Sequence, residues 1–219
     1  MLVDDIDIAI GTEGVLAGAI VARGCVLAER SEGLDRAVER AIGEAAARPD
    51  VQARVSAVRD LLRYGRYKPT GRGKPASEYL LNAAREGRFP RIGTLVDINN
   101  LISLRSLLPI SLIDLDRAAA TSFVVRRGRS GESYVFNPSG QTIDLEDLLL
   151  VAHLPADRPC ATAVKDSMET KLTADSRNVL AIIYAPATLR EELEGATEQF
   201  AGALTEWGGA SAVKSALLR

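Results

Sequence analysis

The stretch that most constrains the fold is Asn178 to Tyr184 (NVLAIIY), which is apolar almost throughout. A run of this length without polar alternation is typical of a strand that is buried on both faces in the centre of a sheet. Further strands are predicted near the start of the chain. Residues 2–10 end in an alternating pattern, and residues 15–22 and 24–28 are short apolar runs separated by glycine.

Apolar residues then recur at helical spacing, which predicts helices over residues 34–48 and 51–62. The first should end before Pro49, because the residue before proline avoids helical backbone angles, and Asp50 is placed to cap the second. Ser77 is the predicted N-cap of a helix through about Arg85. Thr188 to Glu191 forms a capping box that starts another helix.

The second half of the chain reads as strands, turns and short helices. Residues 122–127 and 132–136 flank GRSG, which predicts a hairpin between them. Residues 145–152 (LEDLLLVA) predict a short helix capped by Asp144. A last short helix after Gly208-Gly209 should carry Val213 and Leu217.

Composition bounds the class of protein. The chain has 219 residues, 47% of them hydrophobic and 26% charged, which is typical of a globular protein. Cys25 and Cys160 match no metal-ligand spacing and are interpreted as buried thiols of a reducing compartment. No apolar run approaches the length of a membrane span, and the N-terminus is acidic where a signal peptide would be basic. These features indicate a soluble cytoplasmic protein without a membrane partner, metal or cofactor.

Basic residues gather in one place although the net charge is -2. Between Arg63 and Arg91 there are eight basic residues and two acidic ones, Glu78 and Glu86. Part of this stretch, residues 64–76, is a loop rich in glycine and proline. A basic loop indicates either contact with nucleic-acid phosphates or an ordinary solvated surface, and composition alone does not separate the two.

Polar residues also occur within apolar segments. Asp97, Asn99 and Asn100 lie in the mostly apolar stretch 92–108, where they either cap a helix and tie a neighbouring loop or face a pocket. Asp114 and Asp116 flank Leu115, either as a carboxylate pair for acid–base work or as residues that tie a turn.

Common catalytic motifs are absent. There is no P-loop, GxGxxG, GxSxG or HExxH sequence, and the single histidine, His153, excludes multi-histidine metal sites. We interpret His153 as structural. Motif reading therefore ends at an α/β or α+β protein with one basic loop.

Three longer segments carry a resemblance to a known family. GRYKPTGRGKPASEYLL, LVDINNLISLRSLLP and LIDLDRA, in this order and spacing, resemble the tRNA-binding and editing module of the phenylalanyl-tRNA synthetase beta subunit. The family's Asp-x-x-Asn element reads here as Asp97 and Asn100, followed by Pro109 and Asp114-Leu115-Asp116. NVLAIIYAP is similar to the family's closing strand, so the resemblance covers roughly residues 63–186. The chain is also similar to stand-alone copies of this module.

The resemblance implies an α+β layered fold, shared with a domain of lysidine synthetase, with a β-sandwich-like core flanked by helices. We expect one domain over residues 1–219, with residues 1–62 packed on a core of 63–186 and C-terminal helices in 187–219. In the family, this module removes tyrosine wrongly attached to phenylalanine tRNA. It has no covalent nucleophile, and a positioned water with a donor to the oxyanion suffices for an activated ester.

Two positions differ from the family. Ser111 stands where the family has its pocket histidine, and the position of the pocket glutamate is apolar, close to Ile182. The amino acid removed therefore stays open. The resulting hypothesis takes Ser111, Asp166 and Asn100 as catalytic residues. The expected substrate-binding residues are Arg66, Lys68, Arg72, Lys74, Glu78, Asp97, Asp114, Ser167 and Thr170.

Three functions are compatible with these observations. The first is hydrolysis of a mischarged aminoacyl-tRNA in trans, with tRNA as the partner. The second is a non-catalytic module that binds RNA or an amino acid. The third is an enzyme for a small molecule that reuses the pocket, in which case the basic loop is incidental.

Overall fold

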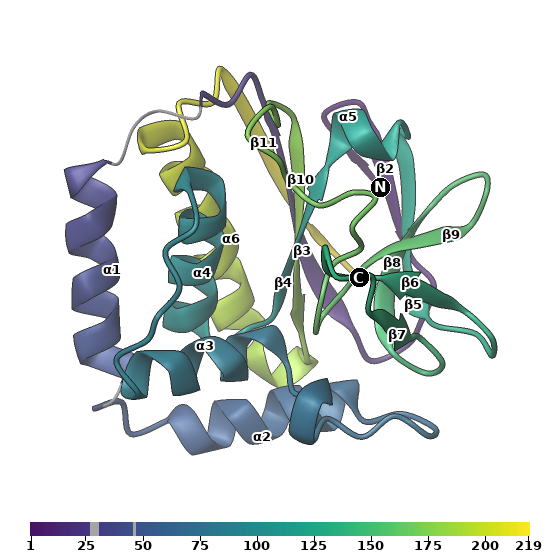
Figure 1. Ribbon diagram of the computed structural model, residues 1–219, viewed down its shortest axis with the longest axis horizontal. Coiled ribbons are helices and arrows are strands. Elements are labelled where there is room, and N and C mark those ends of the chain that lie inside the picture. The colour runs from purple at the N-terminus through teal and green to yellow at the C-terminus, as the bar shows by residue number, and fades with distance from the viewer. Residues whose placement is uncertain (27–30, 46) are drawn as a thin grey trace.

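The computed structural model describes residues 1–26, 31–45 and 47–219. Its layers are a group of helices, a four-stranded sheet and a five-stranded sheet (Figure 1). The helices are α1 (Glu32–Ala45), α2 (Val51–Leu62), α3 (Ala76–Arg85), α4 (Thr94–Ser106), α5 (Leu115–Ala118) and α6 (Arg190–Glu206), with short 3-10 turns at Gly71–Gly73 and Ala187–Leu189. None of these helices is long and apolar enough to cross a membrane.

The four-stranded sheet has the order β11-β3-β10-β4 and is antiparallel throughout. Its strands are β3 (Leu16–Arg23), β4 (Ile110–Asp114), β10 (Val179–Ala185) and β11 (Ala212–Leu218). β10 lies between β3 and β4 and is buried at all seven positions, which confirms the prediction of a central strand. α6 packs on this sheet, α4 packs against α6, and α1 covers α4 from outside (Figure 1).

The five-stranded sheet, of order β1-β2-β5-β8-β9, lies on the other side of the four-stranded one (Figure 1). It consists of β1 (Leu2–Val3), β2 (Ile6–Ile10), β5 (Ser122–Arg127), β8 (Leu149–His153) and β9 (Arg158–Thr162). A separate pair, β6 (Ser133–Val135) and β7 (Thr142–Asp144), projects from its edge. The inner faces of both sheets and the helices on β3 and β10 form one core.

The structure corrects three secondary-structure predictions. Residues 149–153 form strand β8 between β5 and β9 instead of a helix, because an apolar run of this length has no decisive period. The last segment is strand β11, which completes the sheet along β3, so that pairing overrides its helical spacing. β5 and β6 do not pair with each other: β6 pairs with β7 across the 137–140 turn.

The remaining predictions hold for the helices, fail for their caps, or lie partly outside the described residues. The helices expected over 34–48, 51–62 and 77–85 correspond to α1, α2 and α3. Asp50 makes no side-chain cap of α2, contrary to expectation. Ser77 lies inside α3, whose N-cap is Pro75, and α6 begins at Arg190 without a side-chain cap, so the predicted N-cap and capping box are also wrong. Residues 27 and 28 of the predicted run 24–28 lie outside the described part of the chain.

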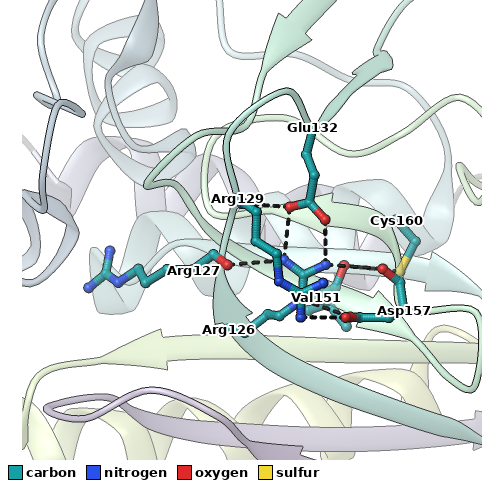
Figure 2. A network of polar contacts seen from close by, with 7 residues as sticks. All are labelled: Arg126, Arg127, Arg129, Glu132, Val151, Asp157 and Cys160. Carbon is teal, nitrogen blue, oxygen red and sulfur yellow. Dashed lines mark hydrogen bonds and ion pairs between the residues drawn. The ribbon is translucent and has the colours of Figure 1, made fainter.

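A buried arginine on β5 links the five-stranded sheet to the loops that precede β6 and β9 (Figure 2). Arg126 on β5 is 6% exposed, and its guanidinium lies between two carboxylates. It donates to Glu132 at 2.7 and 2.9 Å and to Asp157 at 2.8 Å, and also to the carbonyls of Arg127 and Asp157. Glu132 precedes β6 and Asp157 precedes β9, so Arg126 connects the starts of both strands to β5.

One glycine in the core allows α6 to approach the sheet. A Cβ at Gly18 in β3 would lie 2.1 Å from Thr197 Oγ1, which is itself buried and bonded to the Leu193 carbonyl. We therefore expect Gly18→Ala to lower the free energy of unfolding by about 1–3 kcal/mol, as overpacking does elsewhere.

Urea denaturation measures this effect, with Gly202→Ala as the control. Gly202 lies in α6 with open space around its Cβ position, so alanine there should stabilise the helix by up to about 1 kcal/mol. Equal effects of the two substitutions would contradict the close contact at Gly18.

Candidate functional site

A large cleft of about 1640 Å³ opens between the helical side of the molecule and the projecting β6–β7 pair. Its walls come from α3, α4, β4, the 67–74 loop, the β6–β7 pair and the segment 162–172. Segments that lie far apart in the sequence therefore meet in one hollow. Among the predicted residues, Lys68, Arg72, Lys74, Asn100 and Asp166 line it.

Cationic side chains dominate the lining of the cleft. Six of them face it, against the three carboxylates of Glu86, Asp144 and Asp166. The six are Lys68, Arg72, Lys74, Arg88, Lys165 and Lys171. Desolvation, together with the positive charges of Arg72 and Lys171, lowers the pKa of Lys165. Lys165 is therefore close enough to Arg72 and Lys171 for their charges to repel its own, and an anionic ligand would relieve that repulsion.

Aromatic rings are interleaved with the cations. Lys165 Nζ lies 3.8 Å from the centroid of the Phe136 ring, and Lys171 Nζ donates to the Phe136 carbonyl at 2.7 Å. Tyr79 is half exposed, and the Arg88 guanidinium lies 5.7 Å from its ring centroid. Tyr67 donates from its hydroxyl to the Gly73 carbonyl, which holds the basic loop in place. Burial raises the pKa of Tyr67 to about 12, so this donor stays protonated.

Asp166 supplies a carboxylate to the cleft wall. Its Oδ2 accepts from the Leu112 backbone N–H at 3.1 Å, whereas its Oδ1 is buried and makes no hydrogen bond to any described residue. Burial raises the pKa of this carboxyl to about 6, and the hydrogen bond from the Leu112 N–H opposes the shift only in part. The segment that carries it is anchored at Lys165, whose carbonyl accepts from Thr162 at 2.8 Å and Tyr134 at 2.6 Å.

Ser111 lies behind the cleft wall and is fully buried. Its Oγ donates to the Thr162 carbonyl at 3.0 Å and lies 2.8 Å from the Tyr184 hydroxyl. Its neighbours Ile110 and Leu112 do line the cleft, as strand alternation requires. The structure therefore places Ser111 beneath the segment that carries Asp166 and not at the surface of the cleft.

The two asparagines of α4 both line the cleft. Asn100 is 7% exposed, and the Asn99 amide nitrogen lies 3.5 Å from its Oδ1. Asn99 Oδ1 is buried and has no hydrogen-bond partner in the described part of the chain. Asp97, one turn earlier, has a different role: it accepts from the N–H of Ile92 at 2.8 Å and from Arg91. Asp97 therefore ties the loop before the helix.

The remaining predicted residues lie outside the cleft lining. Arg66 is exposed and pairs with Glu146 at 2.8 Å. Glu78 is buried and pairs with Arg59 at 2.7 Å and with Lys74 at 3.2 Å. Burial would raise the pKa of Glu78, but these two cations outweigh it and leave the pKa below its usual value.

Three other predicted residues are engaged in local structure. Asp114 caps α5 by accepting from the N–H groups of Asp116 and Arg117, and it also accepts from the Ser176 hydroxyl. Ser167 Oγ accepts from the Glu169 N–H at 3.2 Å, and Thr170 donates to the Cys160 carbonyl at 2.8 Å. His153, taken as structural, ends β8.

Sequence reasoning missed several residues of the lining. Tyr67, Tyr79, Phe136 and Lys171 line the cleft but were not among the predicted site residues. The two tyrosines lie inside or beside the basic loop, so alternation of aromatic and basic residues was a usable signal. Nothing local marks Phe136 and Lys171, because only the tertiary fold brings the β6–β7 pair to the basic loop.

Comparisons with known proteins bear on this site. A protein-family model described as the B3/4 domain matches residues 66–194, which include the basic loop, α4 and the segment with Asp166. Among solved structures, the chain is similar to an N-terminal fragment of the phenylalanyl-tRNA synthetase beta subunit from Pyrococcus horikoshii. The TM-score is 0.50 and the sequence identity 13%.

That similarity covers 95% of this chain and 50% of the other, so the chain spans half the length of that structure. At this identity the likeness concerns the fold, and it confirms the predicted α+β class. The sequence matches no curated protein.

Proposed function

Because this chain belongs to the B3/4 domain family, as the resemblance in its sequence predicted, we propose that it binds the 3′ end of an aminoacylated tRNA in the cleft and hydrolyses the aminoacyl ester. One observation carries the proposal. A cleft of about 1640 Å³ combines six cationic side chains with a buried, unpaired carboxylate oxygen in its wall. We expect such a protein to work in the cytoplasm, where its tRNA partner is found.

The size of the cleft favours the end of a nucleic acid over a small metabolite. Pockets for small ligands usually have about 300–1000 Å³, and this cleft is larger. Lysine and arginine around it suit a phosphate backbone, and Tyr79 and Phe136 are placed to stack on unpaired bases. An enzyme for a small molecule would need neither feature.

The chemistry requires little beyond positioning. An aminoacyl ester is activated, so a bound water can attack its carbonyl carbon while the ribose oxygen leaves with a proton. The Asn100 amide lies on the wall, where it can donate to the developing oxyanion. Ser111 is buried and bonded, so we assign it a supporting role beneath Asp166 and not that of a nucleophile.

Release of amino acid from a panel of mischarged tRNAs tests the proposal. We expect purified protein to deacylate at least one of them, and Asn100→Ala to slow that reaction by about 10²-fold, as loss of an oxyanion donor does in other enzymes. Failure to deacylate any tRNA of the panel would rule out hydrolysis. Binding without release would leave a tRNA-binding module.

Phosphate binding gives a separate prediction. The double variant Lys68→Ala/Arg72→Ala should weaken tRNA binding, because each cation that neutralises a phosphate releases counterions from the RNA. The slope of log affinity against log salt should become shallower by about 1 for every phosphate that the variant no longer neutralises. Filter binding at several salt concentrations measures both the affinity and the slope.

Arg40→Ala is the matched control for this experiment, because Arg40 is an exposed cation of α1 that does not line the cleft. Its slope should stay at the wild-type value. If all variants share one slope, the cleft is not where the phosphates bind.

A further inference from the structure

The cleft holds hydrogen-bond acceptors that nothing in the protein satisfies. In the described part of the chain, three buried side-chain polar atoms lack a partner: Asn99 Oδ1, Asp166 Oδ1 and Arg127 Nε. The two acceptors both belong to residues that line the cleft, whereas Arg127 does not line it. Buried acceptors without partners are rare in native proteins, and a bound water, ion or ligand usually explains them. A ligand with hydrogen-bond donors is the explanation that fits two such acceptors on residues of one cleft.

The cations of the cleft do not meet this need. No ion pair joins Asp166 to a lysine or arginine of the described residues, although Lys171 acts on it at longer range. Lys165 lies over the Phe136 ring, and Lys171 donates to the Phe136 carbonyl. Both ammonium groups are thus directed to the β6–β7 pair and leave Asp166 Oδ1 without a countercharge.

We propose that Asp166 binds the free α-ammonium group of the aminoacyl ester, so that the protein acts on esters with a free amino group and discriminates against N-acylated ones. This inference rests on the proposed function, because the ester is the one that the cleft would hydrolyse. It assigns Asp166 to substrate recognition and not to proton abstraction from water.

The distribution of charge in the cleft fits such a substrate. An aminoacylated 3′ end carries anionic phosphates along the nucleotides and one cation, the α-ammonium, at the amino acid. The cleft presents lysines and arginines from the 67–74 loop and an unpaired carboxylate from segment 162–172. An ammonium supplies a positive charge and three donors to a desolvated carboxylate, whereas an N-acyl amide supplies one donor and no charge.

Two measurements test the inference. The first compares the rate at which amino acid is released from an aminoacyl-tRNA with the rate for its N-acetylated form. The second compares binding of tyrosine and alanine methyl esters with that of their N-acetyl derivatives, by calorimetry. We expect wild-type protein to prefer the free amine by about tenfold or more in both, the range for a bond to a charged group. Asp166→Asn, which keeps the shape but removes the charge, should lose most of this preference.

Asp175→Asn is the matched control, since it is the same substitution at an exposed site outside the cleft. Equal wild-type rates on free and N-acetylated substrates would overturn the inference and leave the hydrolysis standing. A loss of rate in Asp166→Asn with the preference intact would also overturn it, because Asp166 would then act on water. Selective binding of the free esters without release from any tRNA would support the ammonium site and refute the hydrolysis.

Discussion

Replacement of Asp166 by asparagine is expected to raise the free energy of unfolding by up to about 3 kcal/mol at pH 7. Burial raises the pKa of this carboxyl from 3.8 to about 6. A difference of about two pKa units corresponds to about 3 kcal/mol of differential stability. Asparagine can keep the bond from the Leu112 N–H through its carbonyl oxygen and removes the charge that burial disfavours.

The direction of the pKa change determines the pH window of the effect. Below about pH 4 the carboxyl is protonated in both the folded and the unfolded chain, so the two proteins should differ little. Between about pH 4 and pH 6 the unfolded chain releases the proton while the folded chain retains it, so wild-type stability should fall as pH rises. Above about pH 6 the carboxyl is ionised in both the folded and the unfolded chain, so the difference in unfolding free energy between wild type and Asp166→Asn should stay constant.

Urea denaturation of both proteins at several pH values on either side of this window measures the difference. The neighbouring groups do not interfere, because burial raises the pKa values of Tyr134, Tyr184 and Cys160 far from this window. His153 has a lowered pKa, mainly through desolvation, and is common to both proteins, so subtraction removes its contribution. A difference that is independent of pH would show that Asp166 is not desolvated.

A carboxylate that destabilises the fold needs a reason to be there. Proteins often retain such groups at binding sites, where function requires them despite their cost in stability. The wall of the cleft is such a place, because Asp166 Oδ1 and Asn99 Oδ1 both lie buried and unpaired on it. If Asp166→Asn is more stable and loses its preference for a free amino group, the two results together identify Asp166 as a ligand-binding residue.

The sequence predicted those parts of the site that depend on local composition. The basic loop is visible as a cluster, and three of its four proposed cations line the cleft. Arg66 does not line it and pairs instead with Glu146, a residue distant in the sequence. The burial of Glu78 in an ion pair could not be predicted for the same reason, since its partner Arg59 lies on another helix.

The side of a strand that a residue occupies, and the partner with which a strand pairs, were harder to predict than the positions of the helices and strands. β4 is buried at all its positions, so no alternation shows which side Ser111 occupies. The apolar runs that form β8 and the residues of β11 suit either a helix or a strand, and only pairing with β5, β9 and β3 decides. The contribution of Phe136 to the cleft depends on how the tertiary fold places the β6–β7 pair beside the basic loop.

Arg126→Met is expected to lower the free energy of unfolding by about 3–5 kcal/mol at pH 7. The substitution keeps the apolar stem but leaves Glu132 and Asp157 facing each other without the guanidinium that separates them (Figure 2). Partial burial would raise the pKa values of both carboxyls, but bonds from Arg126, and further contacts with Arg129, outweigh it and hold those pKa values below their usual range. The destabilisation should therefore be complete above about pH 5 and shrink as both carboxyls become protonated at lower pH.

Two controls separate the network from ordinary surface pairs. Arg126→Lys keeps the charge but not the bidentate geometry, so its free energy of unfolding should lie between those of the wild type and Arg126→Met. Arg36→Met breaks an exposed pair with Glu32 on α1 and should change stability by no more than about 0.5 kcal/mol. Urea denaturation at neutral and at acidic pH measures all three variants. If Arg126→Met matched Arg36→Met, the buried arginine would contribute no more to stability than a surface ion pair. Other contacts, including those of Arg129 with Asp157 and Glu132, would then hold the starts of β6 and β9.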